Sequence, residues 1–207
     1  VFLSTESGFG MPDFEAAFFD LGGVTLQPNL LPNAMAHLRR GEPKHFLRVL
    51  WNSLAASVYE DARCFAEWVR RPGVGGGPLY KTPDECKWVQ FLRNALVLEE
   101  AEGLIYGAGV PEEWLLPGKR VRLDRTLTRW GETSVRLEPA SDGSRVAVEL
   151  TLPPLAPRSV SLVVRAPGGR PLRSVTLNGK QWNGFDSLTR TIRIPWRRGI
   201  VQLAVTY

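Results

Sequence analysis

Residues 145–164 read RVAVELTLPPLAPRSVSLVV and show the pattern that decides the fold of the second half of the chain. Apolar side chains occupy alternate positions on both sides of a proline-rich break. They are Val146, Val148, Leu150 and Leu152 before the break, and Val160, Leu162 and Val164 after it. A period of two residues is typical of strands that bury one face. This stretch therefore predicts two successive β-strands.

The same alternation extends to the end of the chain. It returns in VQLAVTY at 201–207, and the pairs Asp142-Gly143 and Asn178-Gly179 favour tight hairpin turns. Several short strands at regular spacing indicate an antiparallel β-sandwich. We expect this sandwich to form a domain over residues 119–207, after a boundary near 114–118.

The first half of the chain has a helical period instead. Between 43 and 59, apolar residues recur three or four positions apart, which predicts an amphipathic helix with Pro43 in its first turn. A shorter helix before it can begin at Pro32 and end at Gly41 in a left-handed conformation, so that the two helices form a hairpin. The predicted fold class is therefore α+β, with a helical region over 1–118 followed by the sandwich.

A third helix is predicted over about 83–100. The segment Thr82-Pro83-Asp84-Glu85 fits a helix start, because Thr82 can cap the helix and Glu85 can complete a capping box. Glu85 is accordingly interpreted as a cap and not as a catalyst. Residues 60–81, between the two long helices, are predicted to be irregular. Their run Val74-Gly75-Gly76-Gly77-Pro78 lacks the lysine of a phosphate-binding loop and is interpreted as a flexible connection.

The composition is that of a globular protein. Of the 207 residues, 43% are hydrophobic and 23% are charged. No apolar run approaches the roughly 18–20 residues that a membrane-spanning helix needs. The chain begins with neither Met nor a signal region, which we interpret as a start inside a longer protein. The compartment stays open, with a preference for the bacterial periplasm or secretion.

Cysteine and histidine are scarce. Cys64, Cys86, His37 and His45 are too few and too widely spaced for a zinc site or a disulfide scaffold. One Cys64–Cys86 disulfide stays open as an alternative, and two buried thiols are the simpler expectation. We predict no metal and no cofactor.

Basic residues are concentrated in the second half, where 119–207 carry 16 basic and 6 acidic side chains. Such an excess raises the question of nucleic-acid binding. The arginines are scattered singly, as in Arg190-Thr191-Ile192-Arg193, which is typical of the solvent faces of strands. We therefore expect neither nucleic acid nor a membrane as a partner.

Two groups of carboxylates lie outside the periodic segments. Glu6, Asp13 and Glu15 lie among glycines and phenylalanines in TESGFGMPDFE at 5–15, which fits either a sugar-binding acid pair or a turn with solvated acids. Glu67 stands between apolar neighbours and precedes Trp68, so it either faces a cleft or pairs with a nearby arginine at the surface. The residues alone leave both questions open.

Six segments, read in order, resemble a known family of enzymes. They are LLPNAMAHLRRGEPKHFLRVLWNSLA at 30–55, LYKTPDECKWVQFLRNALVLEE at 79–100, VPEEWLLPG at 110–118, RTLTRWGETSVRLE at 125–138, VTLNGKQW at 175–182 and VQLAVTY at 201–207. Together they resemble the C-terminal part of bacterial six-hairpin glycosidases, the (α/α)6-toroid enzymes that include α-L-rhamnosidase-like proteins, with their closing β-sandwich.

The resemblance implies a fragment of a glycoside hydrolase that acts on a plant or algal poly- or oligosaccharide with two carboxylates. By position it implies Glu6 and Glu67 as the catalytic pair. It implies contacts to a carbohydrate substrate from Asp13, Glu15, Tyr80 and Trp68. The missing N-terminal part of the same protein is then a partner, and this chain alone is expected to be inactive.

The alternative is a non-catalytic module in which the sandwich binds carbohydrate or serves as a structural cap. An exposed aromatic platform would then be expected from Trp130, Trp182 and Trp196. The opposing interpretation places these tryptophans in the core or at a domain interface, because Trp130 and Trp182 lie beside turns where large rings often seal the end of a sandwich.

Overall fold

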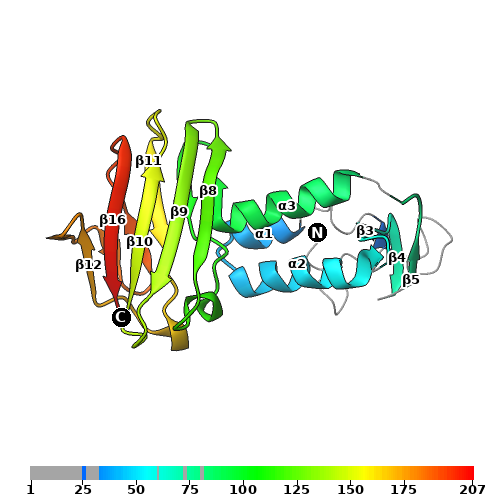
Figure 1. The fold of residues 1–207 in the computed structure, drawn as a ribbon, viewed down its shortest axis with the longest axis horizontal. Coiled ribbons are helices and arrows are strands. Elements are labelled where there is room, and N and C mark those ends of the chain that lie inside the picture. Colours follow the sequence, from blue (N-terminus) through cyan, green and yellow to red (C-terminus); the bar gives the residue numbers. More distant parts are fainter. Residues whose placement is uncertain (1–24, 27–32, 60, 72–73, 80–81) are drawn as a thin grey trace. The chain divides into compact units, whose positions relative to one another are not determined.

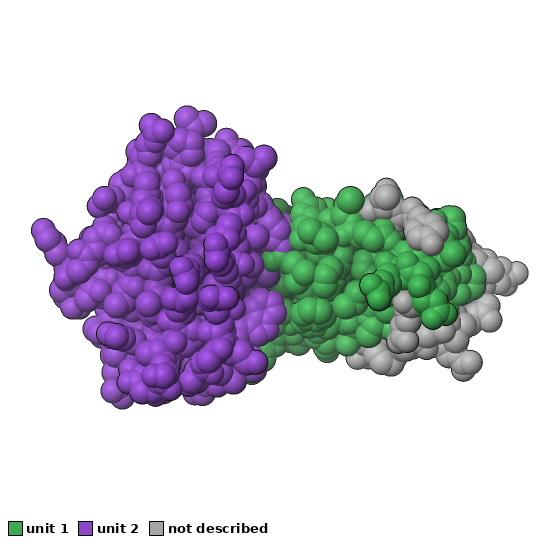
Figure 2. All heavy atoms as spheres, in the orientation of Figure 1, with its two compact units in different colours: residues 1–92 green, residues 93–207 purple. Residues whose placement is uncertain are grey.

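The computed structural model describes residues 25–26, 33–59, 61–71, 74–79 and 82–207. The chain divides into two compact units, residues 1–92 and 93–207 (Figure 2). Helices dominate the described part of the first unit and strands dominate the second, so the α+β class is confirmed. Among the described residues, no helix is long and apolar enough to cross a membrane.

The helices of the first unit follow the predicted hairpin. Helix α1 (Asn33–Arg39) and helix α2 (Pro43–Ser57) pack against each other and are joined through Gly41, whose φ of 71° lies in the left-handed region. Helix α2 begins at the proline that the sequence indicated. It buries Phe46, Val49 and Leu50, which recur at helical spacing on one face. The predicted hairpin is confirmed.

Short strands occupy part of the segment over 60–81 that the sequence predicts to be irregular. Strand β2 (Val58–Tyr59) pairs with β3 (Cys64–Phe65). Strand β4 (Trp68–Arg71) lies between β1 (Thr25–Leu26) and β5 (Val74–Gly76) in a second antiparallel sheet. Residues Val74–Gly76 of the glycine run therefore belong to a paired strand, so the interpretation of the run as a flexible connection was wrong for this part.

The second unit is a β-sandwich of two sheets, whose strands are labelled in Figure 1 where there is room. The six-stranded sheet has the order β13 (Lys180–Gln181), β12 (Ser174–Leu177), β16 (Gly199–Thr206), β10 (Arg145–Leu152), β9 (Gly131–Pro139), β8 (Val121–Thr128). The five-stranded sheet has the order β14 (Phe185–Asp186), β15 (Thr191–Arg193), β11 (Ser159–Val163), β7 (Gly103–Tyr106), β6 (Val97–Glu99). All pairings are antiparallel except that of β7 with β11. Two short 3-10 helices, η2 (Glu112–Leu115) and η3 (Pro167–Gly169), connect strands.

The alternating residues form the core between the sheets. Side chains that are fully enclosed include Leu137, Val146, Leu150, Leu162, Ile192, Val201 and Val205. The core also encloses the hydroxyl group of Tyr106, which lies 2.5 Å from Thr133 Oγ1, and Thr133 in turn donates to the carbonyl of Thr151 at 2.6 Å. Burial raises the pKa of Tyr106 to about 12, so this phenol stays neutral.

The sandwich takes in more of the chain than the change of sequence pattern at 118 indicates. Strands β6 and β7 belong to the second unit, whose first residue is Arg93. Helix α3 (Thr82–Leu96) starts in the first unit and ends in the second. Apolar residues at 97, 98 and 104 all enter the sandwich core or lie buried beside it.

The third helix ends at Leu96, before the predicted end at about 100. The carbonyl of Ala95 accepts the N–H of Gly109, and the carbonyl of Leu96 accepts the N–H of Gly107, both at 2.8 Å. These bonds satisfy the last carbonyls of the helix, so the chain continues into β6 without a glycine cap. A tertiary contact therefore sets this boundary.

The carboxylate of Glu99 in β6 bonds to helix α3 and to the turn after β8. Its carboxylate accepts Arg93 Nη2 at 2.6 Å and the backbone N–H of Arg129 at 3.0 Å. Burial raises the pKa of Glu99, but the hydrogen bonds from Arg129 and Arg93 outweigh burial and leave the pKa below its ordinary value. The ionised carboxylate is therefore the form that stabilises the fold.

We expect Glu99→Gln to lower the free energy of unfolding by about 1 kcal/mol at neutral pH, because it removes charge-assisted bonds. A carboxyl with a depressed folded-state pKa adds stability above its unfolded-state pKa and loses it as the pH falls through the folded-state pKa. The difference from wild type should therefore shrink below pH 4.5, the ordinary pKa value. Urea unfolding over a pH series measures it.

Glu102→Gln is the matched control, because this exposed carboxylate pairs with one exposed arginine, Arg158. Such pairs contribute about 0–1 kcal/mol. Equal losses for the two variants at every pH would contradict the role given to Glu99.

Candidate functional site

Glu67 and Trp68 are the predicted site residues that the structure describes, and they stand at the start of strand β4. The N–H of Glu67 donates to the carbonyl of Gly76 at 2.9 Å, which fixes the backbone at the carboxylate. Both side chains are half-buried. This position fits an acid that is held in place while part of its surface stays open to solvent.

The glycines of β5 make room for these two side chains. A Cβ added at Gly76 would overlap the indole ring of Trp68, which pairs with Gly76 in register. A Cβ at Gly77 would lie 3.0 Å from Glu67 Oε2, and Gly77 has a φ of 104° that favours glycine. The glycine run is thus the surface on which Glu67 and Trp68 pack.

A second group of aromatic side chains gathers around Glu85 in the same unit. Trp88 makes edge contacts with Trp51, at 5.5 Å between ring centroids, and with Phe65, at 6.4 Å. Its indole N–H donates to the carbonyl of Leu50 at 3.1 Å. Trp51 keeps 43% of its surface exposed, so it presents an aromatic face next to this cluster.

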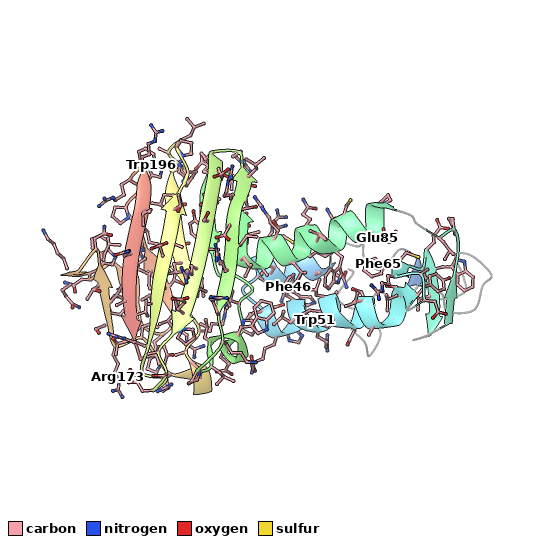
Figure 3. The ribbon with its side chains drawn as sticks, viewed as in Figure 1. Phe46, Trp51, Phe65, Glu85, Arg173 and Trp196 are labelled. Atoms are coloured by element: carbon pink, nitrogen blue, oxygen red, sulfur yellow. The ribbon has the colours of Figure 1, made fainter. Side chains whose placement is uncertain are left out.

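Glu85 uses its carboxylate to join two elements. Its Oε1 accepts the backbone N–H of Phe65 at 3.0 Å, across 20 residues of sequence (Figure 3). Its Oε2 is buried and has no hydrogen-bond partner among the described residues. The structure thus gives Glu85 a tertiary role that its interpretation as a cap of its own helix did not include.

The remaining predicted site residues, Glu6, Asp13, Glu15 and Tyr80, lie outside the described residues. The pairing of Glu6 with Glu67 as catalytic carboxylates therefore stays a prediction. Sequence reasoning missed the group formed by Trp51, Phe65, Glu85 and Trp88. The spacing of Glu85 and Trp88, three positions apart on one helix, was the signal available.

The tryptophans of the sandwich do not form the exposed platform expected of a binding module. Trp130 and Trp182 pack against the core, and the Trp182 indole N–H donates to the carbonyl of Arg193 at 2.9 Å. Trp196 is 38% exposed, with its indole N–H bonded to the carbonyl of Pro153 at 3.1 Å. For Trp130 and Trp182 the packing interpretation is confirmed.

Candidate metal ligands do not gather in the described part of the chain. No group of three or more His, Cys, Asp or Glu there could hold a metal ion. His37 and His45 stack at 5.3 Å between ring centroids, and His37 Nδ1 lies 2.7 Å from Glu42 Oε2. Cys64 and Cys86 are both free, but only Cys64 is buried, so the expectation of two buried thiols was wrong for Cys86.

Neither a protein-family model nor a curated protein matches the sequence. The structure is similar to a GH127 β-L-arabinofuranosidase from Geobacillus stearothermophilus T6, with 13% identity, coverage of 98% of this chain and 36% of that chain, and a TM-score of 0.45. It is also similar to an α-L-rhamnosidase from Dictyoglumus thermophilum, with 10% identity, coverage of 79% and 17%, and a TM-score of 0.40.

A further solved structure, a second GH127 β-arabinofuranosidase, matches with 12% identity, coverage of 98% of this chain and 36% of that chain, and a TM-score of 0.42. The chain thus spans about a third of the length of the two arabinofuranosidases. The matched proteins are glycosidases, as the sequence resemblance led us to expect, and one is an α-L-rhamnosidase. At these identities and TM-scores the similarity assigns no activity to this chain.

We expect Gly76→Ala to lower the free energy of unfolding by about 1–3 kcal/mol, because the new methyl group overlaps the Trp68 indole. In a Trp68→Ala background the same change should cost about 0.5 kcal/mol or less, because the overlapping ring is gone. Denaturant unfolding of the wild type, both single variants and the double variant measures this coupling. A Gly76→Ala cost that is the same in both backgrounds would rule out the contact as its cause.

Proposed function

We propose that this chain is part of a glycoside hydrolase of the (α/α)6-toroid type and that Glu67 is one of its two catalytic carboxylates. The proposal is supported by the segments at 30–55 and 79–100 that resemble such enzymes. It is also supported by the order of the two units, since helices precede a β-sandwich along the chain.

The setting of Glu67 is the observation that carries the proposal. Glu67 is half-buried, its backbone N–H donates to the carbonyl of Gly76, and its side chain lies next to Gly77. Glycosidases need carboxyl groups that are held in a fixed geometry and are still reachable by a sugar. The tied backbone and partial exposure of Glu67 support this role, whereas Glu85 has one oxygen bonded to Phe65 and the other buried.

In such a reaction one carboxylic acid protonates the glycosidic oxygen as the bond to the anomeric carbon breaks. The second group, as a carboxylate, either attacks that carbon or activates the water that does. We propose Glu67 for one of these roles and Glu6 for the other, as the sequence resemblance implies. The distance between the two groups determines whether the configuration is retained or inverted.

Partly exposed aromatic side chains in the same unit as Glu67 suit a sugar substrate. The C–H face of a pyranose or furanose ring packs on an aromatic ring, while its hydroxyl groups bond to polar neighbours. Trp68 follows Glu67 in the sequence and is half-buried, and Trp51 offers an exposed ring in the same unit. We propose a plant or algal poly- or oligosaccharide as the substrate, with Asp13, Glu15 and Tyr80 as further contacts.

The test is hydrolysis of aryl glycosides and plant polysaccharides by the full-length protein that contains this chain. Aryl β-L-arabinofuranoside and α-L-rhamnoside are the first probes, because the structurally similar enzymes carry those names. We expect Glu67→Gln to lower kcat by about 100-fold or more with an unchanged melting temperature, because the amide cannot exchange a proton or attack carbon.

Asp61→Asn is the matched control, since Asp61 is an exposed carboxylate of the same segment. Its kcat should stay within about twofold of wild type. The catalytic role would be refuted if Glu67→Gln were as active as the wild type. It would also be refuted if the wild-type protein cleaved none of the sugars.

A further inference from the structure

The outer face of the six-stranded sheet contains a hollow of about 390 Å³. Its lining residues belong to strands β9, β10, β16 and β12 and to the turn after β12. Figure 1 shows these strands side by side in the sheet. All its lining residues belong to the second unit, so the hollow is complete within the sandwich. Its volume falls within the range of small-ligand sites.

The floor of the hollow is made by small side chains at neighbouring positions. Ala147 of β10 stands directly opposite Ala204 of β16, and Ala204 stands opposite Thr176 of β12. Alanine is depleted in strands, and cross-strand pairs of larger residues stabilise a sheet by about 0.2–1 kcal/mol relative to an alanine pair. The two alanines on the central strands therefore stabilise the sheet less than larger residues would, and they leave space at its outer surface.

One wall of the hollow carries groups that both donate and accept hydrogen bonds. Glu149 of β10 lies between Arg136 of β9 and Gln202 of β16 in register. Gln202 Nε2 donates to Glu149 Oε2 at 3.3 Å, and Arg136 Nε donates to Glu138 Oε1 at 2.9 Å. These bonds hold the polar ends beside the alanine floor.

We propose that this hollow binds an uncharged saccharide chain through the hydroxyl groups of the saccharide. Hydroxyl groups can accept from Arg136 and Gln202 and donate to Glu149, while the C–H face of the sugar rests on the alanine methyl groups. An anionic ligand fits poorly, because the lining includes Glu138 and Glu149 against one arginine. An apolar ligand fits poorly too, since it would strip water from three charged groups.

The site is separate from the proposed catalytic group, because Glu67 belongs to the other unit. The binding site and the activity can therefore fail independently. Loss of turnover in Glu67→Gln should leave binding at the hollow unchanged, and loss of binding at the hollow should leave the cleavage of a small aryl glycoside unchanged.

The experiment is titration calorimetry of the full chain with neutral oligosaccharides and soluble polysaccharides of arabinose, rhamnose, xylose and glucose. We expect at least one of these probes to bind, and Glu149→Ala to weaken it by about tenfold or more. Ala204→Trp should abolish binding by filling the hollow. Because a large residue on a central strand can impair folding, Gln202→Ala provides a second test that adds no bulk.

Glu132→Ala is the matched control, because Glu132 is an exposed carboxylate of β9 on the same sheet, outside the lining of the hollow. Its affinity should equal that of the wild type. The proposal is overturned if no probe binds, if Glu149→Ala and Gln202→Ala bind as the wild type does, or if Glu132→Ala loses affinity equally.

Discussion

Burial of one face of every long strand is the constraint on which the second unit depends. Leu150 and Val201, partners in register on β10 and β16, are completely enclosed, and the positions beside them alternate outward. Because the period is two, each residue assigned to the core fixes its neighbour on the solvent face. The outward positions are thereby free of packing demands, which is why they can carry charges, or the paired alanines of the hollow, without disturbing the core.

The described part of the first unit has a smaller apolar core, and bonds between side chains and backbone join its elements. The carboxylate of Glu85 accepts a hydrogen bond from the N–H of Phe65, and the indole N–H of Trp88 donates to the carbonyl of Leu50. A buried group that loses such a partner costs about 1–3 kcal/mol, so each bond restricts how the short strands and the helices can be arranged. Strand β4, which follows Glu67, pairs with β5, where the absence of a Cβ at Gly76 leaves room for the Trp68 indole.

Patterns within a few residues could be interpreted from the sequence, whereas contacts between distant segments could not. The helical hairpin and the long sandwich strands follow from local periods, and Asn178-Gly179 forms the expected turn with both φ values positive. Strands β3 to β5 are short and pair through tertiary contacts, so a glycine run in them resembled a loop. The end of α3 and the role of Glu85 depend on Gly107, Gly109 and Phe65, which no local pattern connects to them.

The energetics of the hollow indicate what kind of saccharide it serves. Its polar groups are reachable by water, so each hydrogen bond to a sugar replaces one to solvent and contributes about 0.5–1.5 kcal/mol. A few such bonds give only weak affinity for a single short sugar, because association itself costs several kcal/mol. A polymer changes this balance, since a chain that is held at one site meets the second at a high effective concentration. A surface hollow of this kind therefore gains most with an extended polysaccharide that also binds elsewhere on the same protein.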